Sequence, residues 1–284
     1  MRGHLRKMLV EANDPIDYYL KLDDERLHLN PHIGANVTLT WTGTITCISC
    51  GNETRKSYSQ GHCYPCFKKL ASCDLCVVSP ERCHYDAGTC RDPDWGESFC
   101  MQQHLVYLAN SSGIKVGITK EANLPTRWID QGAVQAIPVI AVQTRQQSGF
   151  VEVAFKNHIS DKTQWQRMLK ADAPHIDMQK IRDDLLATIE PELDALRQRF
   201  GIQAIQPLTG DTQIFHYPVQ QYTTKVSSMS FDKTPDVGGA LLGIKGQYLI
   251  FDTGVINLRK FTGYEIEFSA GAEKAERGRQ LSLL

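Results

Sequence analysis

Two pairs of cysteines near the start of the chain have the spacing of metal ligands. Cys47 and Cys50 form one CxxC pair, and Cys63 and Cys66 form a second pair after twelve intervening residues. Four thiolates at this spacing can converge tetrahedrally on one Zn²⁺ ion. Since all four coordination positions then belong to the protein, we expect a closed site in which zinc has a structural role.

A second group of cysteines follows directly, at less regular spacing: Cys73, Cys76, Cys83 and Cys90. His84 or Cys100 could replace one of these ligands. The chain has nine cysteines, so one is left over after two four-ligand sites. The pattern predicts one or two structural zinc ions, in a module that either only supports folding or also holds nucleic acid or a partner.

Downstream of the cysteines lie residues of the types that phosphodiester hydrolysis needs: Tyr107, Lys115, Arg127 and Glu152. One-metal hydrolysis requires a group that activates water, a cation that stabilises charge on the phosphoryl oxygens, and a carboxylate that holds Mg²⁺ or Mn²⁺. Each residue also has a plain structural explanation. Tyr107 could be an amphipathic strand residue, Arg127 a solvated helix charge, and Glu152 an acid favoured near a helix N-terminus.

Short strands and helices must position these residues. The runs HLVYLAN (residues 104–110) and IKVGIT (residues 114–119) are rich in β-forming residues and flank Ser111-Ser112-Gly113, which predicts a hairpin. A short helix is predicted after Pro125, a strand in residues 133–144, and an amphipathic helix carrying Glu152 from about Gly149. The predicted order is β-β-α-β-α.

This segment resembles the GIY-YIG nuclease superfamily over about residues 105–170. Leu105-Val106-Tyr107 stands where the family has its first motif, and Lys115-Val116-Gly117 stands where it has the second. The chain departs from both motifs, because Leu105 replaces a glycine and Lys115 a tyrosine. As a whole, the chain also resembles an uncharacterised bacterial family that combines this domain with an N-terminal cysteine-rich module.

The resemblance implies a role for each candidate residue. Tyr107 would help to activate the attacking water, Arg127 would stabilise the transferring phosphate, and Glu152 would bind the divalent metal. Lys115 could contact a phosphate or lower the pKa of Tyr107. The implied activity is that of a metal-dependent endonuclease, a hydrolase acting on DNA or RNA.

Patterning along the chain predicts an α+β protein of several regions. A β unit is expected in residues 1–46, a ribbon-like zinc module in 47–100, a nuclease-like domain in 101–172, a helical hairpin in 173–205, a second, small all-β unit in 206–270, and a loose tail in 271–284. The nuclease-like domain should contain a small three-stranded antiparallel sheet with flanking helices. The two β units could also form one domain interrupted by the rest.

The charge and composition of the chain limit the kinds of function that we expect for it. The net charge of −1 and pI near 6.7 lack the strongly basic balance of many nucleic-acid-binding proteins. Residues 101–170, however, contain eight Lys and Arg residues against four acidic ones, so a phosphate-binding surface should lie there. The sequence has no long apolar run and no signal-peptide pattern, and its cysteines have metal-ligand spacing, so we expect a cytoplasmic protein without a membrane segment.

Three functional hypotheses follow. The first is a metal-dependent endonuclease with structural zinc, and the second is a non-catalytic nucleic-acid-binding or regulatory zinc protein on a degenerate nuclease scaffold. The third is a zinc-stabilised protein-interaction module. A shared open pocket for Tyr107, Arg127 and Glu152 would favour catalysis, whereas a Glu152 side chain that points elsewhere into a salt bridge would favour binding.

Overall fold

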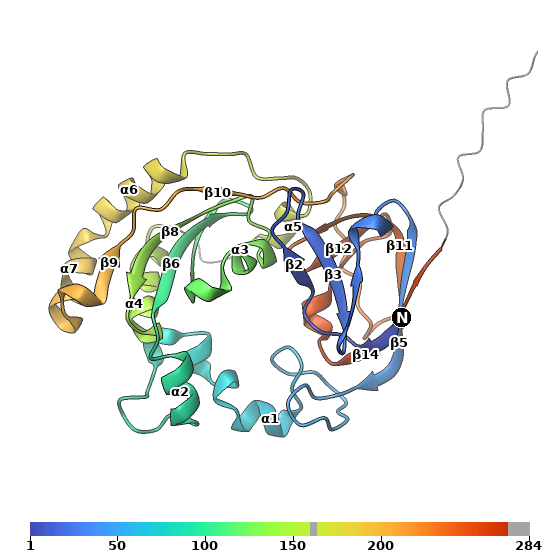
Figure 1. Cartoon of the computed structure of the whole chain (residues 1–284), viewed down its shortest axis with the longest axis horizontal. Helices are drawn as coiled ribbons and strands as arrows, with labels where there is room; N and C mark the ends of the chain where they lie inside the picture. Colours follow the sequence, from blue (N-terminus) through green and yellow to red (C-terminus); the bar gives the residue numbers. More distant parts are fainter. Residues whose placement is uncertain (160–163, 272–284) are drawn as a thin grey trace, which may run out of the picture.

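The fold is mixed α+β, with antiparallel sheets, as the sequence predicts. The computed structural model describes residues 1–159 and 164–271, so most of the predicted tail, residues 272–284, lies outside the described residues. We distinguish the β body (residues 1–46 and 215–271), the central body (residues 101–214) and the cysteine module (residues 47–100). Figure 1 shows the cysteine module running from one body to the other along one side of the molecule.

Segments from both ends of the sequence form the β body. Its larger sheet has the strand order β1 (Arg2–His4), β14 (Tyr264–Ala270), β5 (Asn36–Ile45), β11 (Asp236–Lys245), β12 (Tyr248–Phe251) and β13 (Val255–Asn257). A smaller sheet contains β2 (Leu9–Glu11), β3 (Asp17–Leu22) and β4 (Glu25–His28). The 3-10 turns η1 (Asn30–His32) and η7 (Leu258–Phe261) connect strands of this body. The segments predicted as two β units therefore share one sheet.

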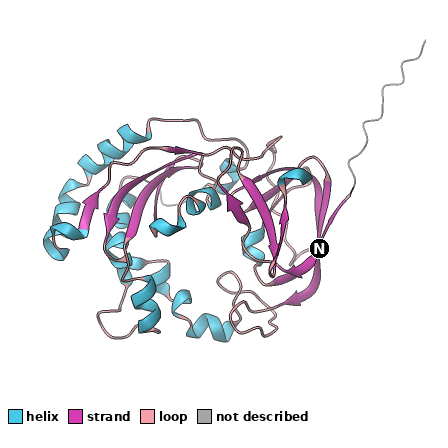
Figure 2. Ribbon diagram, viewed as in Figure 1, coloured by secondary structure: helices cyan, strands magenta, loops and turns pink. Residues whose placement is uncertain are grey.

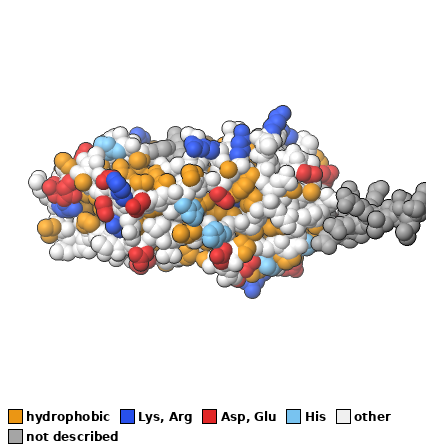
Figure 3. Space-filling view, turned by 90° about the horizontal axis from the view of Figure 1, so that it is seen from above, with side chains coloured by type: hydrophobic (Ala, Val, Ile, Leu, Met, Phe, Trp, Pro, Cys, Tyr) orange, Lys and Arg blue, Asp and Glu red, His pale blue; other side chains and the backbone are white. Residues whose placement is uncertain are grey.

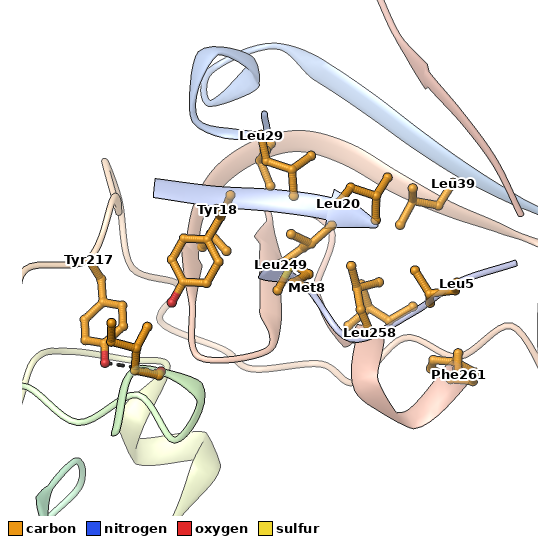
Figure 4. Close-up of a cluster of buried hydrophobic side chains, with 14 of the residues drawn as sticks. Leu5, Met8, Tyr18, Leu20, Leu29, Leu39, Tyr217, Leu249, Leu258 and Phe261 are labelled. Atoms are coloured by element: carbon orange, nitrogen blue, oxygen red, sulfur yellow. Dashed lines mark hydrogen bonds between the residues drawn. The ribbon is translucent and has the colours of Figure 1, made fainter. Parts of the chain in front are cut away.

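A hydrophobic cluster holds the β body together. Along β3, Tyr18, Leu20 and Leu22 are buried and alternate with partly exposed residues, because successive side chains of a strand face opposite sides. Figure 4 shows Tyr18 and Leu20 packed near Leu249 of β12 and Leu258 of η7. Each fully buried aliphatic side chain of this kind contributes about 1.5–3 kcal/mol to folding.

The central body is built on one antiparallel sheet. Its strands run in the order β10 (Gln213–Ile214), β8 (Gln135–Val142), β6 (His104–Asn110) and β7 (Ile114–Thr119), and β9 (Ile205–Pro207) also pairs with β8. The sheet thus has five strands where three are predicted. The two additional strands come from a segment more than sixty positions after β8, so no local pattern links them to it.

Five helices accompany this sheet: α3 (Thr126–Asp130), α4 (Arg145–Lys156), α5 (Trp165–Met168), α6 (Met178–Thr188) and α7 (Glu190–Phe200). The 3-10 turns are η5 (Glu121–Asn123) and η6 (Ile202–Ala204). The order β6, β7, α3, β8, α4 matches the predicted one. Helix α4 begins at Arg145 and not near Gly149, because Thr144 and Gln147 form a capping box that the sequence analysis overlooked. None of the described helices is long and apolar enough to span a bilayer.

The two faces of the central sheet pack against different partners. Along β6, Val106 and Leu108 join a cluster with Phe155 of α4, whereas Tyr107 and Ala109 join the cluster of the β body. This division follows from the two-residue repeat of a strand. Figure 1 shows α6 and α7 on the outer side of the sheet and α3 on the side that faces the β body. The side chain of Tyr107 therefore belongs to the α3 side.

Helix α3 links the central body to the β body. The Tyr217 hydroxyl donates to the carbonyl oxygen of Ala133 at 2.7 Å, and Gln247 Nε2 donates to Asp130 Oδ1 at 2.8 Å. Lys7 forms an ion pair with the same Asp130 carboxylate, which is 3% exposed. Figure 4 shows Tyr217 at one end of the hydrophobic cluster, with its hydroxyl in a hydrogen bond. Side chains of both bodies thus form one continuous core.

The cysteine module consists of short helices and turns: α1 (Tyr64–Lys69), α2 (Pro93–Phe99), η2 (Ala71–Cys73), η3 (Leu75–Val77) and η4 (Pro80–Arg82). The predicted ribbon-like form is not found, since all of residues 47–100 are described and they include isolated bridges but no strand. Prolines in the first turns of α1, η4 and α2 favour helical turns over extended chain. Figure 2 shows helices and loops in this part of the molecule.

Helix α4 packs closely against η4 of the cysteine module at Gly149, and this contact leads to a prediction. A Cβ atom there would meet the backbone nitrogen of Glu81 and would lie 2.8 Å from Cβ of Pro80. Helix propensity alone would favour Gly149→Ala by roughly 1 kcal/mol. We expect the opposite sign: overpacking against η4 should lower the free energy of unfolding, measured by urea titration, by about 1–3 kcal/mol.

Val153→Ala is the matched control, because Val153 lies on the same helix with an exposed side chain. Its free energy of unfolding should change by less than about 1 kcal/mol. A Gly149→Ala variant that is more stable than the wild type would contradict the packing between α4 and η4.

Candidate metal centre and basic pocket

The first four cysteines lie together as the sequence predicts. The sulfur atoms of Cys47, Cys50, Cys63 and Cys66 are all within 4.8 Å of one another. Cys50 Sγ and Cys63 Sγ are 3.7 Å apart. A tetrahedral site with Zn–S bonds of about 2.3 Å holds its sulfur atoms roughly 3.8 Å apart. The cluster therefore has the dimensions to hold a structural zinc ion.

Hydrogen bonds from backbone amides favour the thiolate form that binds a cation at this cluster. Burial raises the pKa of Cys47, but the backbone amides of Cys63, Cys50 and Ser49 donate to its sulfur and lower the pKa to about 6. Hydrogen bonds with the neighbouring thiols of Cys63 and Cys50 raise the pKa of Cys66. A divalent cation removes this conflict, because it displaces the shared protons and binds all four sulfurs as thiolates.

The loop between the two cysteine pairs is attached to the β body. Gln60 has a positive φ of 64° and accepts a hydrogen bond at 2.6 Å from Arg259 Nε in η7. Ser57 Oγ donates to the carbonyl oxygen of Thr262 at 3.0 Å. The first cysteine cluster thus closes a loop that holds the side chain of Arg259.

The second group of cysteines is arranged differently from the prediction. Among the described residues, the other group of ligand atoms within 4.8 Å of one another belongs to Asp74, Cys76 and His84. These three residues line a small cavity together with Cys83, Cys90 and Cys100, but Cys73 does not line it. The predicted set of Cys73, Cys76, Cys83 and Cys90 is therefore not gathered as a unit.

The four residues considered for phosphodiester chemistry lie on four elements: Tyr107 on β6, Lys115 on β7, Arg127 on α3 and Glu152 on α4. Burial raises the pKa of Tyr107, whereas the charge and hydrogen bond of Arg127 lower it and the charge of Glu152 raises it. Burial and the Arg127 charge lower the pKa of Lys115 to about 7. The structure therefore brings these four side chains within electrostatic reach of one another.

Burial limits what this set can contact. Tyr107 is fully buried, and its hydroxyl donates to Gln131 Oε1 at 3.0 Å. A Cβ atom on Gly117 would lie 2.5 Å from the Tyr107 hydroxyl, so the ring requires a glycine at this position of β7. Glu152 forms an ion pair with Lys156 at 3.1 Å. Lys156 lies one turn along the same helix, and the Glu152 charge still acts on Tyr107.

A polar pocket lies beside Arg127, and we call it the basic pocket. Its volume is about 290 Å³, and its walls are formed by Lys7, Ala122, Asn123, Thr126, Arg127, Asp130 and Arg259. Tyr107, Lys115 and Glu152 do not line it. Its three cationic residues come from three separate segments, namely the chain between β1 and β2, helix α3, and η7.

Sequence reasoning missed two residues of the basic pocket. Lys7 and Arg259 belong to the β body and are distant from Arg127 in the sequence, so no local spacing connects them. Burial lowers the pKa of Arg259, the charge of Asp130 raises it, and the charge of Arg127 lowers it. The two guanidinium groups therefore repel each other across the pocket.

Comparison with known proteins corrects the expected family. The chain belongs to the family described as Protein of unknown function (DUF2797), whose model matches residues 34–266. This match includes the segment that was expected to belong to the GIY-YIG nuclease superfamily, and no model of that superfamily matches. The chain matches no curated protein and no solved structure. The short motifs at Tyr107 and Lys115 were insufficient for the assignment, since glycine beside a buried tyrosine also satisfies a packing requirement.

The first cysteine cluster leads to a prediction about zinc. Cys47→Ser should remove about one equivalent of zinc per chain, measured by inductively coupled plasma mass spectrometry, because three ligands hold the ion more weakly. The variant should also unfold at a lower temperature than the wild type, since the metal contributes folding free energy directly.

Ser49→Ala, within the same CxxC segment, is the control and should retain both zinc and thermal stability. Wild-type protein that is folded but holds less than about half an equivalent of zinc after chelator-free purification would refute the metal centre.

Proposed function

We propose that the protein binds nucleic acid and that the basic pocket contacts a backbone phosphate. The observation that carries this proposal is the convergence of Lys7, Arg127 and Arg259 around one pocket with a single carboxylate, Asp130. Phosphate groups are bound in proteins by such sets of lysine and arginine side chains, and arginine can donate two parallel hydrogen bonds to one phosphate.

The charges in the pocket favour an anionic ligand. Lys7 already pairs with Asp130, and Arg259 donates to the neutral side chain of Gln60. Within residues 1–159 and 164–271, no acidic side chain forms an ion pair with Arg127 or Arg259. A phosphate between the two guanidinium groups would replace their repulsion with two attractive contacts.

A nucleic acid suits the local excess of basic residues in the central part of the chain. Residues 101–170 carry eight Lys and Arg residues against four acidic ones, although the chain as a whole has a net charge of −1. On the face shown in Figure 3, basic and acidic side chains are interspersed. Such a protein would contact few phosphates, so its affinity should depend on salt with a modest slope.

Charge reversal in the basic pocket tests this proposal. Arg127→Glu and Arg259→Glu should each weaken binding to labelled single-stranded DNA, double-stranded DNA or RNA, measured by fluorescence anisotropy over a salt series. Because each variant loses a phosphate contact, the slope of log K against log salt should fall by about 1.

Arg199→Glu is the matched control, since Arg199 is exposed on α7 and the substitution changes the charge equally. If the pocket variants and this control have the same affinity and the same salt slope, the nucleic-acid interface does not lie at the pocket.

A second candidate function is metal-dependent phosphodiester hydrolysis at Tyr107, Lys115, Arg127 and Glu152. It is favoured by the influence of Arg127 on the pKa values of both Tyr107 and Lys115, since shifted pKa values are typical of catalytic groups. In this hypothesis Tyr107 activates water and Arg127 stabilises the phosphoryl group. Glu152 fits Mg²⁺ or Mn²⁺ only if Lys156 releases its carboxylate and a substrate phosphate supplies further oxygen ligands.

Two substitutions test hydrolysis. Glu152→Gln should abolish cleavage of labelled nucleic acid in the presence of Mg²⁺ or Mn²⁺, because the amide keeps the size of the side chain but loses its charge. Tyr107→Phe should reduce the cleavage rate about 100-fold or more if its oxygen takes part in proton transfer.

Tyr217→Phe removes a buried hydroxyl outside this set and should leave the cleavage rate nearly unchanged. Equal cleavage by the wild type and Glu152→Gln would indicate a contaminating nuclease. If the protein binds nucleic acid but cleaves no substrate, the binding function is supported and the hydrolysis hypothesis is refuted.

A further inference from the structure

Four cysteines outside the first cluster line one small cavity: Cys76, Cys83, Cys90 and Cys100. The cavity has a volume of about 10 Å³. This is about the space that one water molecule occupies, so it suits a single small ion and no larger ligand. Soft thiolate ligands of this number are typical of structural zinc sites.

Short local elements bring the four thiols to this point. Cys76 lies in η3, Cys83 follows η4, and Cys100 follows α2. The sulfur of Cys90 lies 3.4 Å from the Cβ position of Gly96, so Cys90 packs directly on α2. The Cys100 amide donates to the carbonyl oxygen of Gly96 at 2.7 Å, which attaches the fourth cysteine to the same turn.

The other potential ligands at this cavity already have partners. Asp74 Oδ2 forms an ion pair with Arg91 Nε at 2.6 Å. His84 Nδ1 is 2.8 Å from the hydroxyl of Thr89, and His84 Nε2 is 3.6 Å from Asp74 Oδ2. Cys73 does not line the cavity. Cys90 Sγ also has a partner, because it donates to the carbonyl oxygen of Asp92 at 3.4 Å, and Cys76 Sγ lies within 4.8 Å of the ligand atoms of Asp74 and His84. A thiol gives up its hydrogen when it binds zinc, and zinc favours sulfur ligands, so the four thiols are the preferred ligand set.

The charge beside the cavity suits a metal bound by four thiolates, which carries a net charge of −2. Arg145 donates through Nη2 to the carbonyl oxygen of Val77 at 2.6 Å, and its amide donates to the carbonyl oxygen of Cys100 at 2.8 Å. Its Nε is buried and has no hydrogen-bond partner among the described residues. A zinc-bound thiolate would accept the Nε hydrogen and satisfy this donor.

We propose that Cys76, Cys83, Cys90 and Cys100 bind a second structural zinc ion and that Cys73 remains a free thiol. The four sulfurs are not all within 4.8 Å of one another, as those of the first cluster are, so metal binding draws them together. The carbonyl oxygen of Cys83 accepts from Gln146 Nε2 at 3.0 Å. Through Gln146 and Arg145, the second zinc fastens the cysteine module to the start of α4.

Zinc content of paired variants tests the ligand set, because Cys73 and Cys100 distinguish it from the set expected from spacing alone. Wild-type protein should hold about two equivalents of zinc, Cys73→Ser about two, and Cys100→Ser about one. Cys47→Ser should hold about one equivalent, and the Cys47→Ser/Cys100→Ser double variant close to none. Zinc is measured on monodisperse protein with wild-type circular dichroism.

A wild-type protein with one equivalent, or a Cys73→Ser variant that loses an equivalent, would overturn the proposal. If Cys100→Ser fails to fold, the ligand set is tested by alkylating native wild-type protein and locating the modified cysteines by mass spectrometry. The expected result is that Cys73 reacts with iodoacetamide, while Cys76, Cys83 and Cys90 react only after a chelator has removed zinc. Protection of Cys73 together with reaction of Cys90 in the zinc-loaded protein would refute the ligand set.

Discussion

The cysteine module connects the two bodies although it has almost no hydrophobic core of its own. Apart from its cysteines, Ala71 and Pro80 are its only buried residues with an aliphatic or aromatic side chain. Hydrophobic burial, which stabilises the β body and the central body, therefore contributes little here. The module is held instead by hydrogen bonds to its neighbours, and its first cysteine cluster has the dimensions to hold a zinc ion that would add coordination bonds. The loop between the first cysteine pairs is joined to η7 and the second group to α4, so each half of the module is attached to a different body.

A buried carboxylate organises the opposite side of the molecule. Asp130 accepts from Gln247 and pairs with Lys7, and both partners belong to the β body. A charge in this position is expensive to bury unless it is paired and hydrogen-bonded, so its partners fix α3 in one orientation. Arg127 lies on the same short helix. The groups that join the two bodies are thus also the groups that form the basic pocket, which explains why the pocket lies at the boundary.

Some features of this structure could be predicted from the sequence. The features that could not be predicted depend on contacts between distant parts of the chain. The spacing of Cys47, Cys50, Cys63 and Cys66 was sufficient, because CxxC pairs converge within a short loop. The order of strands and helices around Tyr107 followed from local periodicity. Lys7 and Arg259 could not be found in this way, since only the packing of the β body on α3 brings them to Arg127.

Assignment to a family required the whole chain. Residues 105–170 contain a buried tyrosine beside a glycine, and that pair is explained by the space between β6 and β7. The family match extends over residues 34–266 and therefore includes the cysteine module and most of the C-terminal part of the β body. A short motif can reflect only how a few residues pack. The longer match extends over all three parts of the molecule.

The pairing of β5 with two strands from the C-terminal part of the chain has a consequence for synthesis on the ribosome. Strand β5 is complete by Ile45, but its partners β11 and β14 begin at Asp236 and Tyr264. During translation, the exposed edges of β5 must wait for nearly two hundred further residues, whereas β6, β7 and β8 follow one another and can pair early. The central body can therefore fold first, as domains do during synthesis. Arg259 follows β13 in the sequence, so a nascent chain that has not reached this residue lacks one wall of the basic pocket.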